Sequence, residues 1–304
     1  MISVCSLSDT KTKEIWEVCS AKNDLWSPFS THVWHTTWFE VFGAEYEPLY
    51  LNIDGNIIAP FVKKGYSVMF SGGVEISDYM DIIGDPAKKH EAWEEILTFC
   101  SQHGYRIELR NVPASSPTFH FFQKDMVRED TTPIVQLPTS WDAYVESLDK
   151  HKRHELRRKM RNIEEKYPGI HLERSEKPEH DIAEFLHLMQ GDEKKRMFLT
   201  EDMRKFFTKL AHVFSKEVQL LFCVIDGKHV SATLSFEVGD AVLLYNSGVN
   251  VAKYPNVGFY TKASGIKYAI EHEFREYNFL QGNERYKYDL GGEDFLVYSA
   301  KMKV

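Results

Sequence analysis

The strongest chemical signal in the sequence is a polar segment that follows a predicted strand. Residues 282–292 place Glu284, Tyr286 and Lys287 between glycines. A plain turn has no need of so many charged and aromatic groups, and ligand sites in α/β proteins gather at the carboxyl ends of strands. A carboxylate such as Glu284 could accept a proton, and an ammonium such as Lys287 could stabilise negative charge on a substrate.

A second candidate site is the loop before a predicted helix at residues 258–274. This loop contains Lys253, Asn256, Val257 and Gly258. The first amides of a helix have no partner within the helix, so they can bind a phosphate, and glycine permits its close approach. The loop has neither a GxGxxG nor a Walker sequence, and Asn256 could serve simply as a helix cap. The anion site is therefore a hypothesis that needs independent support.

Residues 150–166 form a basic segment with eight Lys or Arg and three Glu, a local net charge of +5, against −13 for the rest of the chain. Leu156, Met160 and Ile163 recur at helical spacing and predict an amphipathic helix. Arg153 precedes Leu156 by three residues, so it lies beside the apolar stripe. Its guanidinium either binds an anionic group or extends along the surface into solvent.

Metal and covalent-nucleophile chemistry are not favoured by the sequence. The pairs His32 with His35 and His151 with His154 are spaced for one helix face, but no third ligand accompanies either pair. No GxSxG or Cys-His signature marks a nucleophile, and the four cysteines have no motif spacing. We expect no metal cofactor and a reduced, cytoplasmic protein.

Composition narrows the class further. With 43% hydrophobic and 27% charged residues the chain is typical of soluble globular proteins, and its 304 residues suffice for one large or two ordinary domains. Its apolar stretches are shorter than the roughly 20 residues of a membrane span, and the first residues do not resemble a signal peptide. The net charge of −8 argues against a surface devoted to nucleic acid, so we expect neither a membrane span nor a DNA partner.

The elements that position these residues occur in a repeated order. Asp-Gly hairpin signals stand at residues 54–55 and 226–227, an offset of 226 minus 54, or 172 residues. A helical pattern begins about 30 residues beyond each turn, and strands led by Tyr105 and Tyr277 follow, again 172 residues apart. This order predicts two α/β halves, residues 1–135 and 136–304, with one continuous sheet as the alternative.

The remaining predicted elements complete each half. Helical segments are expected at residues 12–21, 31–42, 141–166 and 181–214, and a meander of strands at 218–225, 229–238 and 241–248. The middle strand alternates between an apolar face and a polar face with Ser231, Thr233, Ser235 and Glu237. We expect the polar face to meet water, with a cleft as the alternative.

With these pieces in place, the sequence resembles the GNAT-like acyltransferases of the group that includes the FemAB peptidyltransferases and the CelD (BioF2-type) acetyltransferase domain. The resemblance rests on residues 148–161, on 256–258 together with 282–287, and in the first half on 34–43 and 77–79. One departure is the Asn-Val-Gly sequence at 256–258, where many members carry Ser-Pro-Gly.

The resemblance implies an α/β fold with mixed sheets, in which two GNAT-like halves pack side by side. It implies transfer of an acyl group from acyl-CoA to an amine or hydroxyl of a small molecule or of a cell-envelope or polysaccharide precursor, without a metal. The donor would bind at Lys253, Asn256, Val257 and Gly258. Catalysis would involve Lys287, Glu284, Glu237 and Tyr286. The substrate would contact Arg153, Trp34, His35, Asp78 and Tyr79.

Two alternatives stay open. The donor could be an aminoacyl-tRNA, as in the FemAB branch, because the basic segment would suit a phosphate-rich partner. The chain could also be a GNAT-like binding module without activity, since a fold does not guarantee catalysis. The resemblance implies nothing about oligomeric state.

Overall fold

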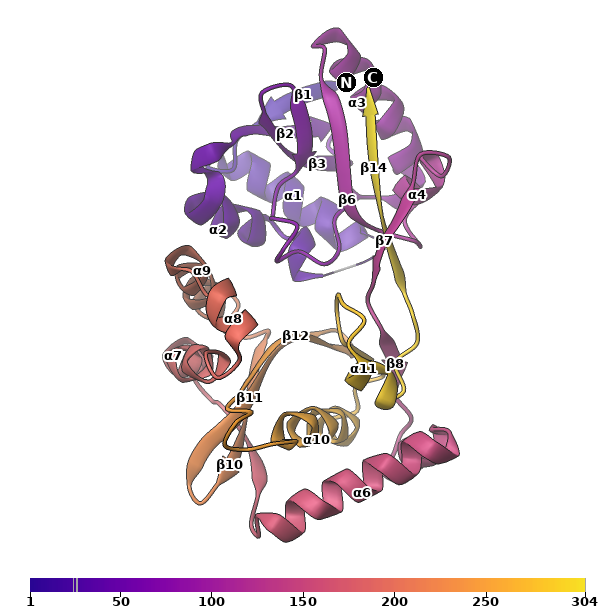
Figure 1. Cartoon of the computed structure of the whole chain (residues 1–304). Coiled ribbons are helices and arrows are strands. Elements are labelled where there is room, and N and C mark those ends of the chain that lie inside the picture. The colour runs from indigo at the N-terminus through magenta and orange to yellow at the C-terminus, as the bar shows by residue number, and fades with distance from the viewer. Residues whose placement is uncertain (24, 26, 304) are drawn as a thin grey trace. The chain divides into compact units, whose positions relative to one another are not determined.

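The chain divides into two units, each built on its own sheet (Figure 1). Unit 1 contains Met1–Thr131 and the segment that starts at Phe295, and unit 2 is Thr132–Asp294. The structure is a computed structural model and describes residues 1–303 except Asp24 and Trp26.

Unit 1 combines four helices with eight strands among the described residues. Its helices are α1 (Thr10–Lys22), α2 (His32–Phe42), α3 (Lys89–Gln102) and α4 (Pro117–Phe121). Its strands are β1 (Ile2–Cys5), β2 (Glu47–Ile53), β3 (Ile57–Lys64), β4 (Ser67–Phe70), β5 (Ile83–Gly84), β6 (Arg106–Pro113), β7 (Val127–Thr131) and β14 (Leu296–Lys303). The strand order is β1-β2-β3-β4-β6-β14-β7, and β5 pairs with β3 beside this path.

Unit 2 has a six-stranded sheet in the order β8-β13-β12-β11-β10-β9. Its strands are β8 (Ile134–Gln136), β9 (His171–Arg174), β10 (Val218–Ile225), β11 (Lys228–Val238), β12 (Ala241–Val249) and β13 (Glu276–Asn278). Its helices are α5 (Trp141–Ser147), α6 (Lys150–Lys166), α7 (Pro178–Met189), α8 (Glu193–Phe198), α9 (Glu201–Val213), α10 (Val257–Glu271) and α11 (Arg285–Asp289).

One succession of elements recurs in both units. The succession is a hairpin, a third antiparallel strand, a helix and a strand parallel to the third. It consists of β2, β3, β4, α3 and β6 in unit 1, where β5 is added between β4 and α3, and of β10, β11, β12, α10 and β13 in unit 2. Asp54 and Gly55 have φ of 51° and 69°, and Asp226 and Gly227 have φ of 50° and 70°. Two successive positive φ values define the type I′ turn, so the predicted hairpins are confirmed. The repeated order of the elements confirms the tandem fold.

The end of the chain differs from the predicted division at residues 135 and 136. Strand β14 follows unit 2 in the sequence but pairs with β6 and β7 of unit 1. Strand β8 follows unit 1 in the sequence but pairs with β13 of unit 2. Each repeat ends in a fourth strand, which is β6 in unit 1 and β13 in unit 2. The antiparallel neighbour of β6 is β14, which comes after β13 in the sequence, and the antiparallel neighbour of β13 is β8, which comes after β6. Residues from Phe295 onward therefore belong with the first half.

Two predicted helical segments are interrupted. The segment 141–166 splits into α5 and α6, because the side chain of Asp149 accepts a hydrogen bond from the amide of Lys152 at 2.9 Å and starts a new helix. The segment 181–214 splits into α7, α8 and α9, where Asp192 and Thr200 cap the second and third helices. Side-chain caps thus override a nearly continuous helical pattern.

The polar face of β11 is buried, which corrects the expectation that it meets water. Ser231, Thr233 and Ser235 are each 1% exposed. The helices α7 and α10 both contact β11, so the strand is covered. The Ser231 hydroxyl donates to the carbonyl of Gly248 at 3.0 Å, which satisfies one of these buried polar groups within the sheet.

Candidate functional site

The second half of β12 has no strand partner on one side among the described residues. β13 pairs with β12 only from Ala241 to Leu243 and ends at Asn278, whereas β12 continues to Val249. The register with β11 shifts so that Tyr245 is an extra residue on β12, and such a bulge bends a strand. The two parallel strands therefore separate, and residues 244–249 present a backbone edge that an extended ligand could pair with.

Helix α10 begins directly after this edge. Asn256 precedes it with φ of 68° and makes no side-chain capping bond, so the predicted Asn256 cap role is not fulfilled by its side chain. A Cβ atom at Gly258 would lie 3.2 Å from Val249 Cγ1, so glycine allows the first turn of the helix to pack against the end of β12. The amides of Val257 and Phe259 bond to backbone carbonyls. The predicted row of free amides is therefore reduced to Gly258 in the described part of the chain.

Lys287 is buried at 2% exposure and holds the end of β13. Its ammonium donates to the carbonyls of Leu280, Gln281 and Gly282 at 2.9, 2.7 and 3.1 Å and forms an ion pair with Glu284 at 3.0 Å. An ammonium has three hydrogens, so these four acceptors occupy all of them. The side chain predicted to act on a donor thus serves first as a cap for three backbone carbonyls.

Lys262 on α10 lies beside this cap. Its side chain is 8% exposed, its ammonium donates to the Gly258 carbonyl at 3.2 Å, and it lies 4.8 Å from the centre of the Tyr286 ring. Burial, aided by the positive charges of Lys195 and Lys287, lowers the pKa of Lys262 to about 7. Burial also raises the pKa of Tyr286 well above its usual value.

Lys195 reaches the same place from α8. Its ammonium donates to the backbone carbonyl of Ser247 on the open edge of β12 and to the Ser247 hydroxyl at 3.0 Å. Burial lowers the pKa of Lys195 to about 8, an effect that Asp192 and Glu284 oppose. Three elements distant in sequence thus bring Lys195, Lys262 and Lys287 together beside the open edge.

Comparison with known families identifies the domain in which this arrangement lies. Residues 150–288, which include α6, the open edge, α10 and the lysines, match the family model of the acetyltransferase (GNAT) domain. The chain contains a GNAT-like acetyltransferase domain. No protein with a curated description matches the sequence.

Solved structures resemble the whole chain in fold. FemX has a TM-score of 0.65 at 12% identity, over 98% of this chain and 96% of that one. L-PGS from Bacillus licheniformis has a TM-score of 0.62 at 12% identity, over 96% and 91%. A tandem GNAT protein from the clavulanic acid biosynthesis pathway has a TM-score of 0.50 at 12% identity, over 99% and 98%. At these identities the likeness concerns the fold, and it agrees with the tandem arrangement.

Glu237 is not brought together with the other predicted catalytic residues of the GNAT-like domain. Glu237 lies on β11 and pairs with Val242 near the start of β12, whereas the lysines lie near the end of β12. Its carboxylate accepts hydrogen bonds from Arg174 at 2.8 Å and Gln219 at 2.6 Å. The contacts of Glu237 therefore fix it within the sheet.

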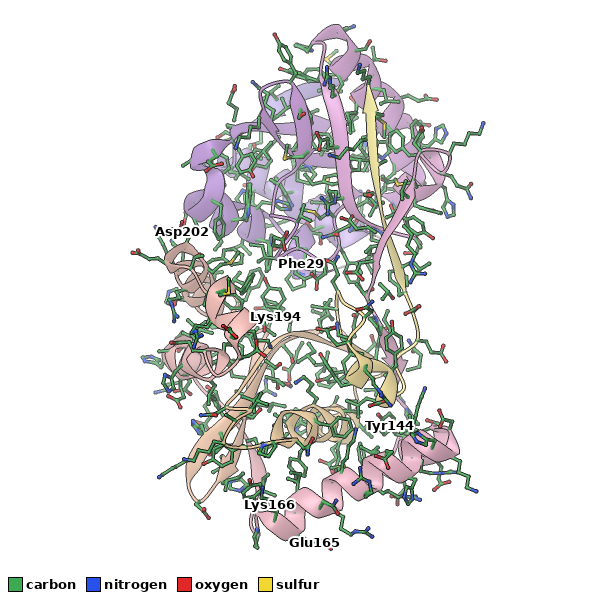
Figure 2. The ribbon with its side chains drawn as sticks, in the orientation of Figure 1. Phe29, Tyr144, Glu165, Lys166, Lys194 and Asp202 are labelled. Atoms are coloured by element: carbon green, nitrogen blue, oxygen red, sulfur yellow. The ribbon has the colours of Figure 1, made fainter. Side chains whose placement is uncertain are left out.

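Arg153 has a carboxylate partner of its own chain. It forms an ion pair with Glu146, which also pairs with Arg157 at 2.7 Å. The predicted apolar stripe of α6 is buried at Leu156 and Ile163, which join the apolar clusters beneath α10. The remaining surface of the helix carries exposed charge, which includes Glu165 and Lys166 at its end (Figure 2).

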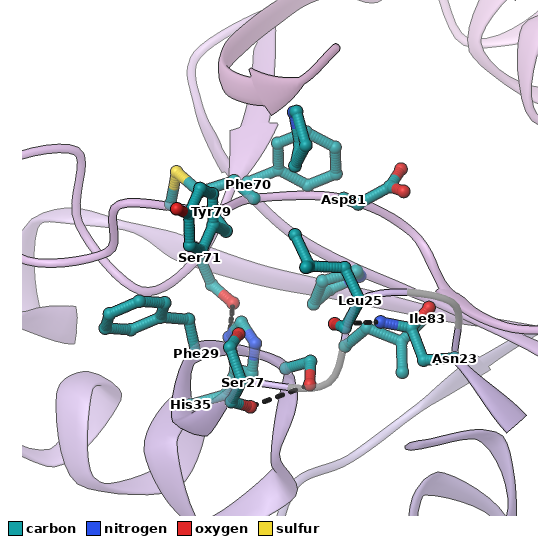
Figure 3. A pocket seen from close by; sticks show the side chains of 14 residues that line it. Asn23, Leu25, Ser27, Phe29, His35, Phe70, Ser71, Tyr79, Asp81 and Ile83 are labelled. Atoms are coloured by element: carbon teal, nitrogen blue, oxygen red, sulfur yellow. Dashed lines mark hydrogen bonds between the residues drawn. The ribbon is translucent and has the colours of Figure 1, made fainter. Parts of the chain in front are cut away.

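In unit 1 the predicted substrate residues pack closely. Trp34 donates to the Ser77 hydroxyl at 2.9 Å, and His35 shares a 2.6 Å hydrogen bond with Ser71. His35 and Tyr79 line a cavity of about 20 Å³, space for about one water (Figure 3). Burial lowers the pKa of His35 to about 3. Asp78 is half-buried and does not line this cavity.

A larger cavity of unit 1 was missed from the sequence. It measures about 120 Å³ and lies where β4 and β6, paired from Ser67 to Met69, separate. This is the position in the repeat that corresponds to the open edge of β12. Its lining includes Trp38, Tyr46, Met69, Glu108 and Arg110.

Lys262 and Lys195 were also missed. Lys262 could have been singled out as a charged residue on the buried side of a helix, because its neighbours Thr261 and Ala263, and Ile266 one turn further on, are buried too. Nothing local marks Lys195. Among the described residues, no three His, Cys, Asp or Glu side chains are grouped to hold a metal ion, and no helix is long and apolar enough to cross a bilayer.

Proposed function

We propose that the chain transfers an acyl group from acyl-CoA to an amine or hydroxyl of a small molecule or a cell-envelope or polysaccharide precursor in the cytoplasm. The observation that carries the proposal is the open edge of β12 beside the start of α10, within the GNAT-like domain. An edge of this kind offers alternating donors and acceptors to the amides of an extended acyl-carrying arm.

The donor would lie along residues 244–249 and end at the start of α10. The Gly258 amide, which has no partner among the described residues, and the exposed Lys253 side chain would contact its phosphates. Asn256 and Val257 form the turn that brings this amide to the edge. The donor carbonyl would then lie near the lysines and Tyr286.

The transfer itself forms one bond and breaks another. The acceptor nitrogen or oxygen attacks the thioester carbonyl carbon, the carbon–sulfur bond breaks, and CoA leaves as a thiolate that takes up a proton. Because burial keeps the Tyr286 hydroxyl protonated, this hydroxyl is suited to donate a hydrogen bond to the departing sulfur, and the proton that the thiolate takes up comes from water. Glu284, which Lys287 holds and which is 58% exposed, can accept the acceptor's proton and pass it to water.

We assign the acceptor to unit 1. The cavity near His35 and Tyr79 admits about one water, whereas the 120 Å³ cavity near Trp38 approaches the size that holds a small ring in an apolar protein cavity. Glu108 and Arg110 supply charge to its lining. The larger cavity is therefore the better acceptor candidate.

The test is thiol release from acetyl-CoA with a panel of amines, amino sugars and amino acids. Tyr286→Phe should lower kcat at least tenfold while CoA still raises the melting temperature as in wild type. Tyr288→Phe on the same helix is the matched control, because its hydroxyl bonds to Asp294 at 2.7 Å and has no assigned role in the transfer. CoA binding without turnover would favour a binding module, and absence of stabilisation by CoA would contradict the proposal.

An aminoacyl-tRNA donor is the second candidate, because α6 carries exposed cations at Lys150, Arg157, Arg158, Arg161 and Lys166. Such a donor would bind with a steep salt dependence. Replacing Arg161 and Lys166 by Glu should then weaken tRNA binding and leave CoA stabilisation unchanged. Stabilisation by charged tRNA and not by CoA would replace the first candidate by this one.

A further inference from the structure

We infer that Lys195, Lys262 and the Ser247 hydroxyl form a subsite for an anionic oxygen group, a carboxylate or a phosphate, of the molecule bound at the open edge of β12. The inference rests on the proposed function, since it names the chemistry of one substrate group at the same site. It concerns residues that the sequence had not singled out.

The first argument is an excess of positive charge. Lys287 is paired with Glu284, but neither Lys195 nor Lys262 forms an ion pair with a carboxylate of the described chain. Asp192 and Glu284 act on Lys195 only from a longer distance. An ammonium taken out of water without a charged partner is costly, so two of them in one place favour the binding of an anion there.

The second argument is a set of unused hydrogen-bond donors. Lys262 uses one of its three hydrogens, on the Gly258 carbonyl, and Lys195 uses two, on the carbonyl and hydroxyl of Ser247. Two hydrogens remain on Lys262 and one on Lys195. The oxygens of a carboxylate or phosphate accept several such bonds at once, so one anionic group would satisfy both lysines.

A structural explanation of Lys262 is its contact with the Tyr286 ring, a cation–π interaction. That contact satisfies none of the free hydrogens and does not involve Lys195. Burial lowers the pKa of Lys262 to about 7, and a bound anion would raise that pKa because it would favour the charged form. Proton affinity therefore offers a direct readout of occupancy.

The experiment uses the full chain labelled with carbon-13, and follows the Cε resonances of the lysines by NMR as pH is varied with and without a probe. The probes are inorganic phosphate and acetate in separate arms. We expect a saturable shift of the Lys262 and Lys195 signals with at least one probe, and a rise of at least tenfold in the proton affinity of Lys262. The preferred probe identifies the group as a phosphate or a carboxylate.

The variants are Lys262→Met and Lys195→Met, each expected to weaken probe binding at least tenfold, with Lys262→Arg retaining most of it. Lys267→Met is the matched control on the same helix, since Lys267 is exposed and pairs with Glu271 at 3.8 Å. The subsite is overturned if both Met variants bind the probes as the wild type does. It is also overturned if neither Lys195 nor Lys262 responds to phosphate or to acetate. Because neither readout involves acyl transfer, an inactive protein that still binds the anion contradicts only the proposed function.

Discussion

Removing the Lys287 ammonium should lower the stability of unit 2, quite apart from any effect on catalysis. Lys287→Met keeps the length of the side chain but leaves the carbonyls of Leu280, Gln281 and Gly282 without this donor. A buried acceptor that loses its partner costs about 1–3 kcal/mol, and a hydrogen bond to a charged group is at the upper end. Allowing for relaxation and water entry, we expect a loss of roughly 3–5 kcal/mol, a large part of the typical stability of a domain.

The measurement is urea unfolding of the purified variant, combined with hydrogen exchange of peptides from β13 and α11. Exchange should accelerate there and remain unchanged in unit 1. Glu284→Gln is the matched control, because it removes the half-exposed ion pair and keeps the cap, and should cost less than about 1 kcal/mol. A loss below about 1 kcal/mol in Lys287→Met would refute the cap, and any loss of activity in that variant could then be attributed to chemistry.

Three further predictions concern unit 1. Lys89→Met should cost about 3–5 kcal/mol in urea unfolding, because the fully buried Lys89 pairs with Asp81 at 2.7 Å, and a loss near zero would show that the carboxylate is solvated. Since the pKa of His35 is about 3 when folded and about 6.5 when unfolded, the unfolded chain binds its proton first, so stability should fall by up to about 1.4 kcal/mol per pH unit from pH 6.5 towards 3. His35→Gln should remove that part of the slope, and an unchanged slope would contradict burial of a neutral ring. Met69→Trp should narrow the 120 Å³ cavity and raise the acceptor KM at least tenfold without changing the donor KM, whereas an acceptor KM equal to that of the wild type would exclude the cavity from acceptor binding.

The features that were predictable from the sequence are those that local chemistry determines. The Asp-Gly turns specify positive φ at two successive residues, and this alone locates both hairpins. The apolar stripe of α6 follows from helical spacing. The caps at Asp149, Asp192 and Thr200 were readable in principle, but the helical pattern on both sides of them concealed the breaks.

The unpredicted features depend on which distant segments meet. The segment of β14 can be read as a strand, but no local pattern says that it joins the sheet of unit 1. Lys195 and Lys262 are 67 residues apart, 262 minus 195, and approach one another only because α8 and α10 both reach the end of β12. Lys287 was singled out by the charged and aromatic residues around it in the sequence, but its three backbone carbonyl partners could not be predicted from the sequence.

The crossing of β14 into the sheet of unit 1 has a consequence for synthesis on the ribosome. β14 emerges only after every residue of unit 2, so the sheet of unit 1 waits for its strand between β6 and β7 until the other unit has been made. Unit 2, by contrast, begins with β8 and holds all its strands once β13 has emerged. A nascent chain that ends at Asp294, followed by a linker long enough to bring Asp294 out of the ribosome, should therefore contain a protease-resistant unit 2 and a unit 1 in which β6 and β7 remain unprotected. The part that is translated first is thus the last to be completed.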